Sequence, residues 1–415
     1  MSEWKLTDFG KIPIHWELKK IIDLKSDDKR AIAMGPFGSN IKVENFVESG
    51  VPVIRGTNLN YAKFVDGEFV FLTDEKADEL IGSNCKAGDL VFTHRGTIGQ
   101  VGLIPSNKYQ RYVISQSGMK LTVNPELINN EFLFYFFKSK FGQYQILKYE
   151  SQVGVPSISN PLTSLKEIEV PVPPLPEQTA IASVLSCLDD KIDLLHRQNA
   201  TLEKMAETLF RQWFVEEAKE EWEMGKVSDL IKILSGFAFK SSSFVESGKY
   251  RLITIKGVQD GYLELNNADK IEELPDRMPD FCKLQIGDIL LSLTGNVGRC
   301  CLVDTTDLLL NQRVAKLHPI NERDRAYTYF LFRQPQIKQL LEEMGKGTAQ
   351  SNLSPIETSN MELIIPDKEK LTEFSTIATP WLNKLLFNKK AIQTLSNLRD
   401  SLLPKLMSGE VTVEI

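Results

Sequence analysis

PEQTAIASVLSCLDDKIDLLHRQNATLEKMAETLFRQW occupies residues 176–213 and contains no glycine and no proline after its first residue. Apolar side chains recur along it in alternating steps of four and three residues, with one asparagine in the series. The series consists of Ile181, Leu185, Leu188, Ile192, Leu195, Asn199, Leu202, Ala206, Leu209 and Trp213. Heptad spacing of this kind places the side chains on one helix face and predicts a coiled-coil seam. Forty helical residues at ~1.5 Å each would extend roughly 60 Å.

A second series with the same spacing lies near the C-terminus. It consists of Phe374, Ala378, Trp381, Leu385, Asn388, Ile392, Leu395, Arg399 and Leu402. Asn388 interrupts this seam as Asn199 interrupts the first, and a buried asparagine lowers stability while fixing register and partner. We therefore expect the two seams to pair with each other as an antiparallel two-helix spacer. Pro380 is expected to kink the second helix or begin its main segment, and Pro404 to end it.

Outside these helices the chain repeats itself. The pentapeptide FVESG occurs at residues 46–50 and 244–248, and KAGDLVFTHRGTIG (86–99) parallels LQIGDILLSLTGNVG (284–298). Aromatic runs at 132–137 and 327–332 also correspond, and the offset between the copies drifts only between about 194 and 199 residues. This is the signature of a duplication. We divide the chain into a first domain (1–175, head 1), a central helix (176–220), a second domain (221–366, head 2) and a C-terminal helix (367–415).

Each head is expected to have a mixed α/β (α+β) fold. Short β-branched runs bounded by Gly, Asn and Asp predict strands at 51–54, 69–73, 90–93, 252–255, 289–292 and 362–365. The aromatic runs lie in helix-like stretches at 131–148 and 326–344, where they are expected to form core. Two similar heads on a paired-helix spacer predict a chain with approximate two-fold symmetry.

Composition limits the function classes. The 415 residues are 42% hydrophobic and 25% charged, which is typical of globular domains. No apolar run approaches the ~20 residues that span a bilayer, and the first residues lack a secretory signal pattern. Five scattered cysteines without CxxC spacing indicate reduced thiols in a cytoplasmic protein. The four histidines are isolated from one another, so a zinc site is not expected.

Two similar heads at a fixed separation suit a ligand that is itself nearly symmetric. B-DNA is such a ligand, because dimeric readers contact half-sites about one helical turn, ~34 Å, or a multiple apart. The chain carries no obvious catalytic constellation. An adenine methyltransferase would need an Asn/Asp-Pro-Pro-aromatic loop, and only NPE (124–126) and NPL (160–162) are present. Two alternatives remain open, namely a bilobed enzyme with its active site between the heads and an assembly scaffold that binds protein.

Several stretches resemble a known family. PPLPEQTAIASVLSCLDDKIDLLHRQNATLEKMAETLFRQWFV (173–215) and LRDSLLPKLMSGEV (398–411) are similar to the two spacer regions of type I restriction-modification specificity subunits. GDLVFTHRGTIG (88–99), GDILLSLTGNVG (287–298) and GFAFKSSSF (236–244) resemble motifs of that family's target recognition domains. The resemblance spans essentially the whole chain. It departs at Pro380 and at DKEKLTEF (367–374), which differs from the start of the first helix.

The resemblance implies a subunit that performs no chemistry itself. Each head would read one half of a split double-stranded DNA target, and the spacer helices would set the distance between the halves. The helices would also dock two methyltransferase subunits that modify adenine N6 with S-adenosylmethionine. Restriction and translocation subunits would join them, and Mg²⁺ and ATP would belong to these partners rather than to this chain.

Base edges are read by Arg, Lys, Asn, Gln, Ser and Thr on loops and helix ends. Loops that correspond in both heads are therefore the candidate DNA contacts. Head 1 contributes Arg55, Thr57, Asn58, His94, Arg95, Thr97, Ser115, Gln116 and Ser117. Head 2 contributes Lys256, Gln259, Asp260, Thr294, Asn296, Arg299, Asn311, Gln312, Arg313, Gln350, Ser351 and Asn352. Because the two sets differ, the two half-sites are expected to differ in sequence.

DNA-binding proteins are usually basic, whereas this chain has a net charge of −6. Residues 1–175 carry 20 basic and 20 acidic side chains, and residues 224–366 carry 17 and 18. Residues 176–223 carry 5 basic and 11 acidic side chains, so the acidity lies on the first spacer helix, which is expected to face a protein partner or solvent. Neutral heads attract DNA weakly. We expect the isolated chain to bind DNA poorly, and tight specific binding in a mobility-shift assay at moderate salt would contradict this.

Overall fold

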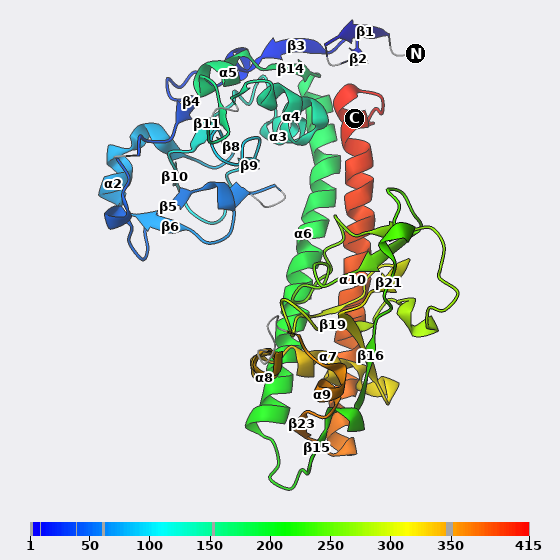
Figure 1. Ribbon diagram of the computed structural model, residues 1–415. Coiled ribbons are helices and arrows are strands. Elements are labelled where there is room, and N and C mark those ends of the chain that lie inside the picture. The colour runs from blue at the N-terminus through cyan, green and yellow to red at the C-terminus, as the bar shows by residue number, and fades with distance from the viewer. Residues whose placement is uncertain are drawn as a thin grey trace. The chain divides into compact units, whose positions relative to one another are not determined.

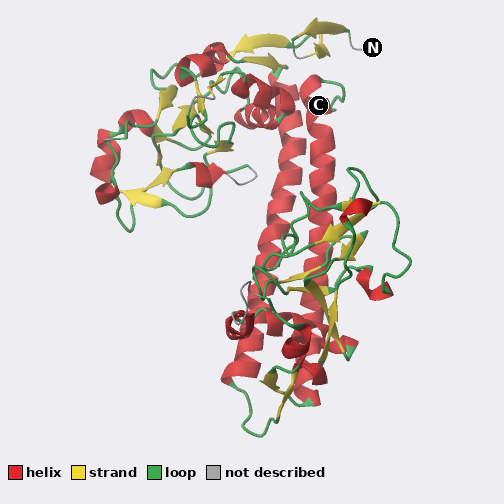
Figure 2. Cartoon of the chain, viewed as in Figure 1, coloured by secondary structure: helices red, strands yellow, loops and turns green. Residues whose placement is uncertain are grey.

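The computed structural model describes residues 3–8, 10–38, 40–59, 63–151, 154–345 and 352–414 (Figure 1). The chain forms two compact units. Unit 1 consists of Met1–Asp193 and Thr394–Ile415, and unit 2 consists of Leu194–Gln393. Each unit contains one head and a part of both long helices, and each combines helices with strands (Figure 2). The expected mixed α/β fold is confirmed.

Head 1 is built on two four-stranded sheets. The first has the strand order β6 (Val70–Leu72), β5 (Val51–Ile54), β10 (Tyr112–Ile114), β7 (Asn84–Cys85). Within it, β5 and β10 are parallel and the other neighbours are antiparallel. The second sheet is antiparallel, with the order β4 (Ile32–Met34), β11 (Gly118–Leu121), β8 (Leu90–Thr93), β9 (Val101–Leu103).

Smaller elements complete head 1. Paired strands are β1 (Trp4–Thr7) with β2 (Gly10–Pro13), β3 (Glu17–Lys20) with β14 (Glu169–Val172), and β12 (Glu150–Ser151) with β13 (Ser157–Ile158). The helices are α1 (Ile21–Leu24), α2 (Asp74–Glu79), α3 (Asn130–Lys138), α4 (Lys140–Leu147) and α5 (Pro161–Glu167).

Head 2 repeats this topology. One sheet has the order β18 (Lys270–Ile271), β17 (Tyr250–Ile253), β21 (Leu308–Leu310), in which β17 and β21 are parallel as β5 and β10 are in head 1. The other has the order β16 (Ile231–Ser235), β22 (Val314–Pro319), β19 (Ile289–Ser292), β20 (Cys300–Leu302). A ribbon of β15 (Met224–Lys226) and β23 (Glu362–Ile364) matches β3 and β14, and the helices are α7 (Arg325–Phe332), α8 (Pro335–Gly345) and α9 (Pro355–Ser359). The structure therefore confirms the duplication.

The expected strands all occur, although the one expected at 252–255 lies two residues earlier as β17. The two helix-like stretches are helical, and each is divided into two helices. Ser139 causes the first break, because its extended backbone ends α3 and its hydroxyl caps α4 by accepting from the Gly142 amide. Pro335 begins α8 after the second break. The aromatic run of α3 is fully buried, as expected for core.

Two long helices carry the heptad series. They are α6 (Leu175–Arg211), which continues into a π-helical turn at Gln212–Glu216, and α10 (Lys368–Ser408). In unit 2, Phe210 of α6 packs on Phe374 of α10, and Asn199 lies beside Asn388. In unit 1, Asp189 binds Arg399, and Ile181 and Leu185 share a core cluster with Leu406 and Met407. Within each unit the two helices therefore run antiparallel, and every residue of both series is buried or half-buried.

The structure overturns the expectation that α10 ends at Pro404, and it excludes one of the two alternatives for Pro380, namely that the helix begins there. The helix begins at Lys368, where Asp367 caps it by accepting from the Lys370 amide at 2.7 Å, and it passes through Pro380 without beginning there. It also passes through Pro404 and ends only before Gly409, whose φ of +73° is the left-handed conformation that stops helices. Buried side chains on both sides of Pro380, including Ala378 and Leu382, outweigh the hydrogen bond that proline removes.

The two asparagines of the seams meet in the core of unit 2. The Asn388 side chain is fully buried and donates from Nδ2 to Asn199 Oδ1 at 2.9 Å. Its own oxygen accepts no hydrogen bond from any described residue. Because only a matched pair of positions can form this contact, the amide pair favours one register of α6 against α10.

We expect Asn388→Leu to lower the free energy of unfolding by about 2 kcal/mol, because it leaves the buried Asn199 amide without its donor. The double variant Asn199→Leu/Asn388→Leu removes both polar groups and should be neutral or stabilising. Urea denaturation measures both, with Lys204→Leu on the exposed side of α6 as the control. Equal destabilisation by the single and double variants would show that the amide pair is not the relevant interaction.

Candidate nucleic-acid interface

In head 1 the candidate loops meet at one edge, where the chain passes from β10 in one sheet to β11 in the other. Strands β4, β5 and β8 end at the same edge, so the loops that follow them begin there. This is because β4 and β8 are antiparallel to β11, whereas β5 is parallel to β10. The His94 amide donates to the Ser117 carbonyl at 2.9 Å, and the Gly35 amide donates to the Gly118 carbonyl at 2.8 Å. Gln100 Nε2 donates to the Gly56 carbonyl at 3.1 Å. Two backbone hydrogen bonds and one from the Gln100 side chain thus hold four loops in one cluster.

Head 2 builds the same edge at the passage from β21 to β22. The Leu293 amide donates to the Arg313 carbonyl at 2.9 Å, and the Gly236 amide donates to the Val314 carbonyl at 3.0 Å. These bonds correspond to those of His94 and Gly35 in head 1. Arg299 also donates to Gln259, which joins the loop after β17 to the loop after β19.

The candidate residues of head 1 differ in the exposure of their side chains. Exposed side chains are Arg55, Thr57, Arg95, Thr97 and Gln116, and half-buried ones are Ser115 and Ser117. Asn58 and His94 are buried. Asn58 folds its own loop, since it accepts from the Arg55 amide and donates to the carbonyls of Asp66 and Glu68. His94 lies 3.1 Å from the Gln116 carbonyl, and burial lowers the pKa of its imidazole.

In head 2 the exposed candidates are Lys256, Asp260, Asn296, Gln312, Arg313 and Asn352, and the half-buried ones are Gln259, Arg299 and Asn311. Thr294 is buried and donates to Asn352 Oδ1 at 2.7 Å. Asp260 forms an ion pair with Lys338 of α8. Arg313 has a φ of +68°, a left-handed backbone that is costly for arginine. Gln350 and Ser351 lie outside the described residues.

Comparison with known proteins identifies the family. A family model described as the type I restriction modification DNA specificity domain matches residues 38–204 and 219–398. The two matched segments correspond to the two copies of the repeat, each with its helix. The chain belongs to the type I restriction-modification DNA specificity family.

Curated proteins that are similar to this chain along most of its length are specificity subunits of type I restriction enzymes. The chain is 26% identical to the type I restriction enzyme MjaIX specificity subunit of Methanocaldococcus jannaschii, in an alignment that covers 100% of this chain and 97% of the relative. It is 22% identical to the EcoKI specificity subunit of Escherichia coli, over 98% of this chain and 91% of the relative. The crystal structure of a type I restriction-modification S subunit from M. genitalium has the same fold, with a TM-score of 0.63, 18% identity and 98% coverage of both chains.

The candidate DNA contacts included no residue of one loop in each head, although the loop of head 2 lies in GFAFKSSSF (236–244), which resembles a recognition motif. Gly35 and Gly236 each precede an aromatic segment and each lie against the strand-crossing loop. A Cβ atom on Gly35 would lie 1.8 Å from the Ser115 carbonyl oxygen, and one on Gly236 would lie 2.2 Å from the Asn311 carbonyl oxygen. Only glycine permits this close approach. These glycines belong to no periodic pattern along the chain, so the sequence alone could not reveal their contact with the strand-crossing loop.

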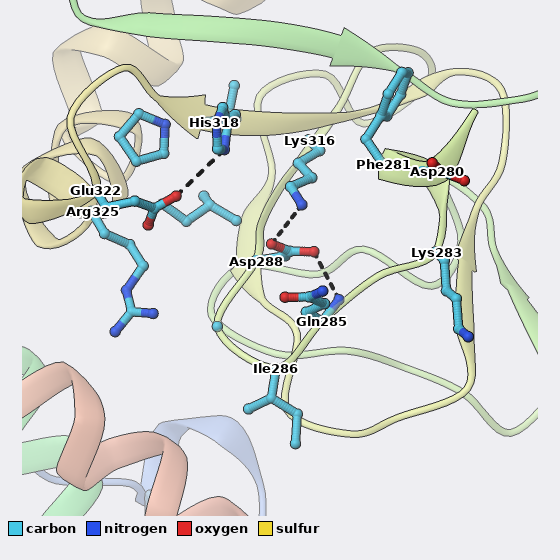
Figure 3. A pocket seen from close by; sticks show the side chains of 14 residues that line it. Asp280, Phe281, Lys283, Gln285, Ile286, Asp288, Lys316, His318, Glu322 and Arg325 are labelled. Carbon is cyan, nitrogen blue, oxygen red and sulfur yellow. Dashed lines mark hydrogen bonds and ion pairs between the residues drawn. The ribbon is translucent and has the colours of Figure 1, made fainter.

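The Gly-Asp motifs that resemble the family's recognition motifs have a structural role. Asp288 accepts from the Gln285 amide at 2.8 Å and binds the Lys316 ammonium at 2.8 Å, beside a pocket of about 360 Å³ (Figure 3). Asp89 of head 1 accepts from Thr122 at 2.7 Å, and its burial raises the pKa of its carboxyl group. Both aspartates stabilise the turn that enters β8 or β19, at the opposite strand end from the candidate loops.

The acidic side chains of α6 bind the heads. In unit 1, Trp16 Nε1 donates to Glu177 at 3.1 Å, and Tyr135 donates to Asp189 at 2.8 Å. Lys63, which is buried, lies 3.1 Å from Asp190. The expectation that this acidity faces a protein partner or solvent is therefore wrong for Glu177 and Asp189, which are buried and bound by the chain's own donors. Asp190 pairs with Lys63 but keeps 64% of its side chain exposed, as expected for a solvated helix face.

Unit 2 uses the same arrangement. Arg333 donates to Glu207 at 3.0 Å, and Tyr329 donates to Glu203 at 3.3 Å. At the start of α10, Trp222 Nε1 donates to Asp367 at 3.1 Å, which matches the contact of Trp16 with Glu177. Hydrogen bonds from Lys219 and the Lys370 amide lower the pKa of Asp367 to about 2. The divergent DKEKLTEF segment thus preserves the contact that PEQ makes in the first copy.

The described part of the chain was also compared with what a metal site and a membrane-spanning helix require. Within those residues, no three His, Cys, Asp or Glu side chains are placed to hold a metal ion. A search of the same residues finds no helix with the length and apolar character of a membrane span.

Proposed function

We propose that this chain is the subunit that selects the DNA sequence in a type I restriction-modification complex, reading a bipartite, asymmetric target. The observation that carries the proposal is the presence of two loop clusters of the same construction with different exposed side chains. Head 1 offers Arg55, Arg95 and Gln116, whereas head 2 offers Lys256, Gln312 and Arg313. Arginine, lysine and glutamine on loops are the side chains that read base edges in the major groove.

We further propose that the antiparallel helix pair acts as the spacer between the two half-sites and as the docking surface for two adenine-N6 methyltransferase subunits. In this proposal restriction and translocation subunits join the complex, which acts on cytoplasmic DNA. The chain itself is non-catalytic. S-adenosylmethionine, Mg²⁺ and ATP would be held by the partner subunits.

An exchange of heads tests the proposal. Residues 224–366 are replaced by the corresponding segment of a relative with a different target, and the hybrid is expressed with its methyltransferase subunits. Sequencing of methylated adenines in the host DNA should show one half of the target changed and the other half retained. A control chain with the same junctions and its own head should keep the original target. An unchanged target in the hybrid would instead identify the chain as a protein-binding scaffold.

A further inference from the structure

The loop at 35–38 of head 1 exposes an aromatic ring. The Phe37 side chain is 84% exposed, although burying a phenylalanine typically gains about 1.5–3 kcal/mol. Single exposed apolar residues are common on protein surfaces, so exposure alone assigns no role. The position of Phe37 indicates a role, because its loop is one of those that meet at the candidate DNA edge.

The loop that carries Phe37 is held from both sides. The Gly35 amide donates to the Gly118 carbonyl at 2.8 Å, and Gly35 leaves no room for a Cβ against Ser115. Pro36 is buried, and a Cβ on Gly38 would lie 2.5 Å from the Gln116 side-chain oxygen. The ring is therefore presented by a loop that is packed against the strand-crossing segment, beside the exposed Gln116.

Head 2 uses the aromatic residues of its equivalent loop differently. Phe239 is only 7% exposed and packs edge-to-face on Phe237 with ring centroids 5.1 Å apart. Both rings contribute to an apolar cluster that includes Tyr250 and Leu252. The loop after β16 thus buries its rings in the core of head 2, whereas the loop after β4 leaves Phe37 in solvent.

The surroundings of Phe37 favour a base over a protein as its partner. Stable protein interfaces bury about 1,200–2,000 Å² in total and have apolar cores of several residues. The residue after Phe37, Gly38, instead lies against the polar and exposed Gln116 side chain, and the loop after β8 brings the exposed Arg95 to the same edge. A lone apolar ring among cationic and amide groups suits a base, either stacked between base pairs as a wedge or packed on a thymine methyl group.

We propose that Phe37 is an apolar base-contacting residue of the half-site read by head 1, and that the equivalent loop of head 2 supplies no such contact. The inference rests on the proposed function, because it requires that head 1 contacts DNA. It deepens that function by assigning to the half-site of head 1 an apolar contact from a loop whose counterpart in head 2 packs its rings against an apolar cluster.

The test uses the chain assembled with its methyltransferase subunits and a duplex that carries the target. Fluorescence anisotropy at fixed salt gives the Kd for target and for unrelated duplex. We expect Phe37→Ala to raise the target Kd about tenfold, since contacts between bases and aromatic side chains contribute about 1–3 kcal/mol each. Phe37→Trp should stay within about threefold, and binding to unrelated duplex should not change. Leu6→Ala, at a residue that is 82% exposed on β1, is the matched control and should bind as the parent does.

Two further measurements distinguish the forms of contact, and either positive result supports the proposal. Loss of duplex bending in Phe37→Ala, measured by energy transfer between end labels, indicates a wedge. A penalty for replacing thymidine by deoxyuridine that is present in the parent and absent in Phe37→Ala indicates a methyl contact. A target Kd within twofold of the parent, or an equal loss on unrelated duplex, would overturn the proposal. A parent complex that does not prefer its target would refute the proposed function instead.

Discussion

Gly35→Ala should remove recognition of one half-site while leaving the other intact. The new methyl group would lie 1.8 Å from the Ser115 carbonyl oxygen, so either the loop at 35–38 or the strand-crossing segment must move. Ser115, Gln116 and Ser117 belong to that segment. A displaced reading loop loses several base contacts at once, and each mismatched base pair costs about 1–3 kcal/mol. We expect target affinity of the assembled complex to fall by about 100-fold, which corresponds to about 2.7 kcal/mol.

Scrambled half-sites make the test specific. In the parent complex, scrambling either half of the target should weaken binding. In Gly35→Ala, scrambling the half-site of head 1 should have little further effect, whereas scrambling the other half should still weaken binding. Gly236→Ala should show the reverse pattern, because its Cβ would lie 2.2 Å from the Asn311 carbonyl oxygen.

Gly82→Ala provides the matched control, since no atom lies within 4 Å of the position that its Cβ would occupy. It should bind like the parent. If Gly35→Ala retained full sensitivity to the sequence of both half-sites, the glycine contact would not position the reading loop. Circular dichroism of each variant separates a local displacement from unfolding of the head.

Asp189→Ala should lower the free energy of unfolding of unit 1 by about 3 kcal/mol, because removal of one partner from a buried ion pair leaves the other charge without compensation. The Asp189 side chain is 4% exposed and accepts from Tyr135 at 2.8 Å and from Arg399 at 2.8 Å. Burial, reinforced by the Asp189 carboxylate, raises the pKa of Tyr135 and keeps the phenol protonated as a donor. The aspartate on α6 thus joins head 1 to α10.

Asp400→Ala is the natural comparison. Asp400 binds the same guanidinium of Arg399 at 2.8 Å, but its side chain is 63% exposed. Exposed ion pairs typically contribute about 0.2–1 kcal/mol, so this variant should change little. Urea denaturation followed by tryptophan fluorescence measures both. Equal effects of the two substitutions would show that burial of Asp189 does not control the stability of this junction.

The reading edge illustrates how far sequence reasoning reaches. Paired loops in the two copies were enough to select most of the segments that the structure brings together at one edge of each head, although the loops after β4 and β16 were not among the candidates. The same reasoning could not separate Arg95, which is exposed, from His94, which is buried beside the Gln116 carbonyl. Burial of a loop residue depends on which distant segment covers it, and here that segment lies more than twenty residues away along the chain.

The long helices show the same division. Heptad spacing is a property of helix geometry, so the two seams and their antiparallel pairing could be read from residue order alone. The end of α10 could not be read from residue order. Pro404 is a local signal for a helix end that packing overrides, and the helix ends only before Gly409. Likewise, the acidity of α6 was apparent from residue counts, but not its use in binding Trp16, Tyr135 and Arg333 of the heads.

Residue order therefore established the duplication, the paired-helix seam and the two sets of loops, since each is expressed in periodicities or repeats along the chain. Tertiary structure alone established which loop side chains face solvent, why Gly35 and Gly236 must be glycine, and where the helix acids bind. Those outcomes depend on atoms from segments far apart in sequence, whose approach no local pattern records.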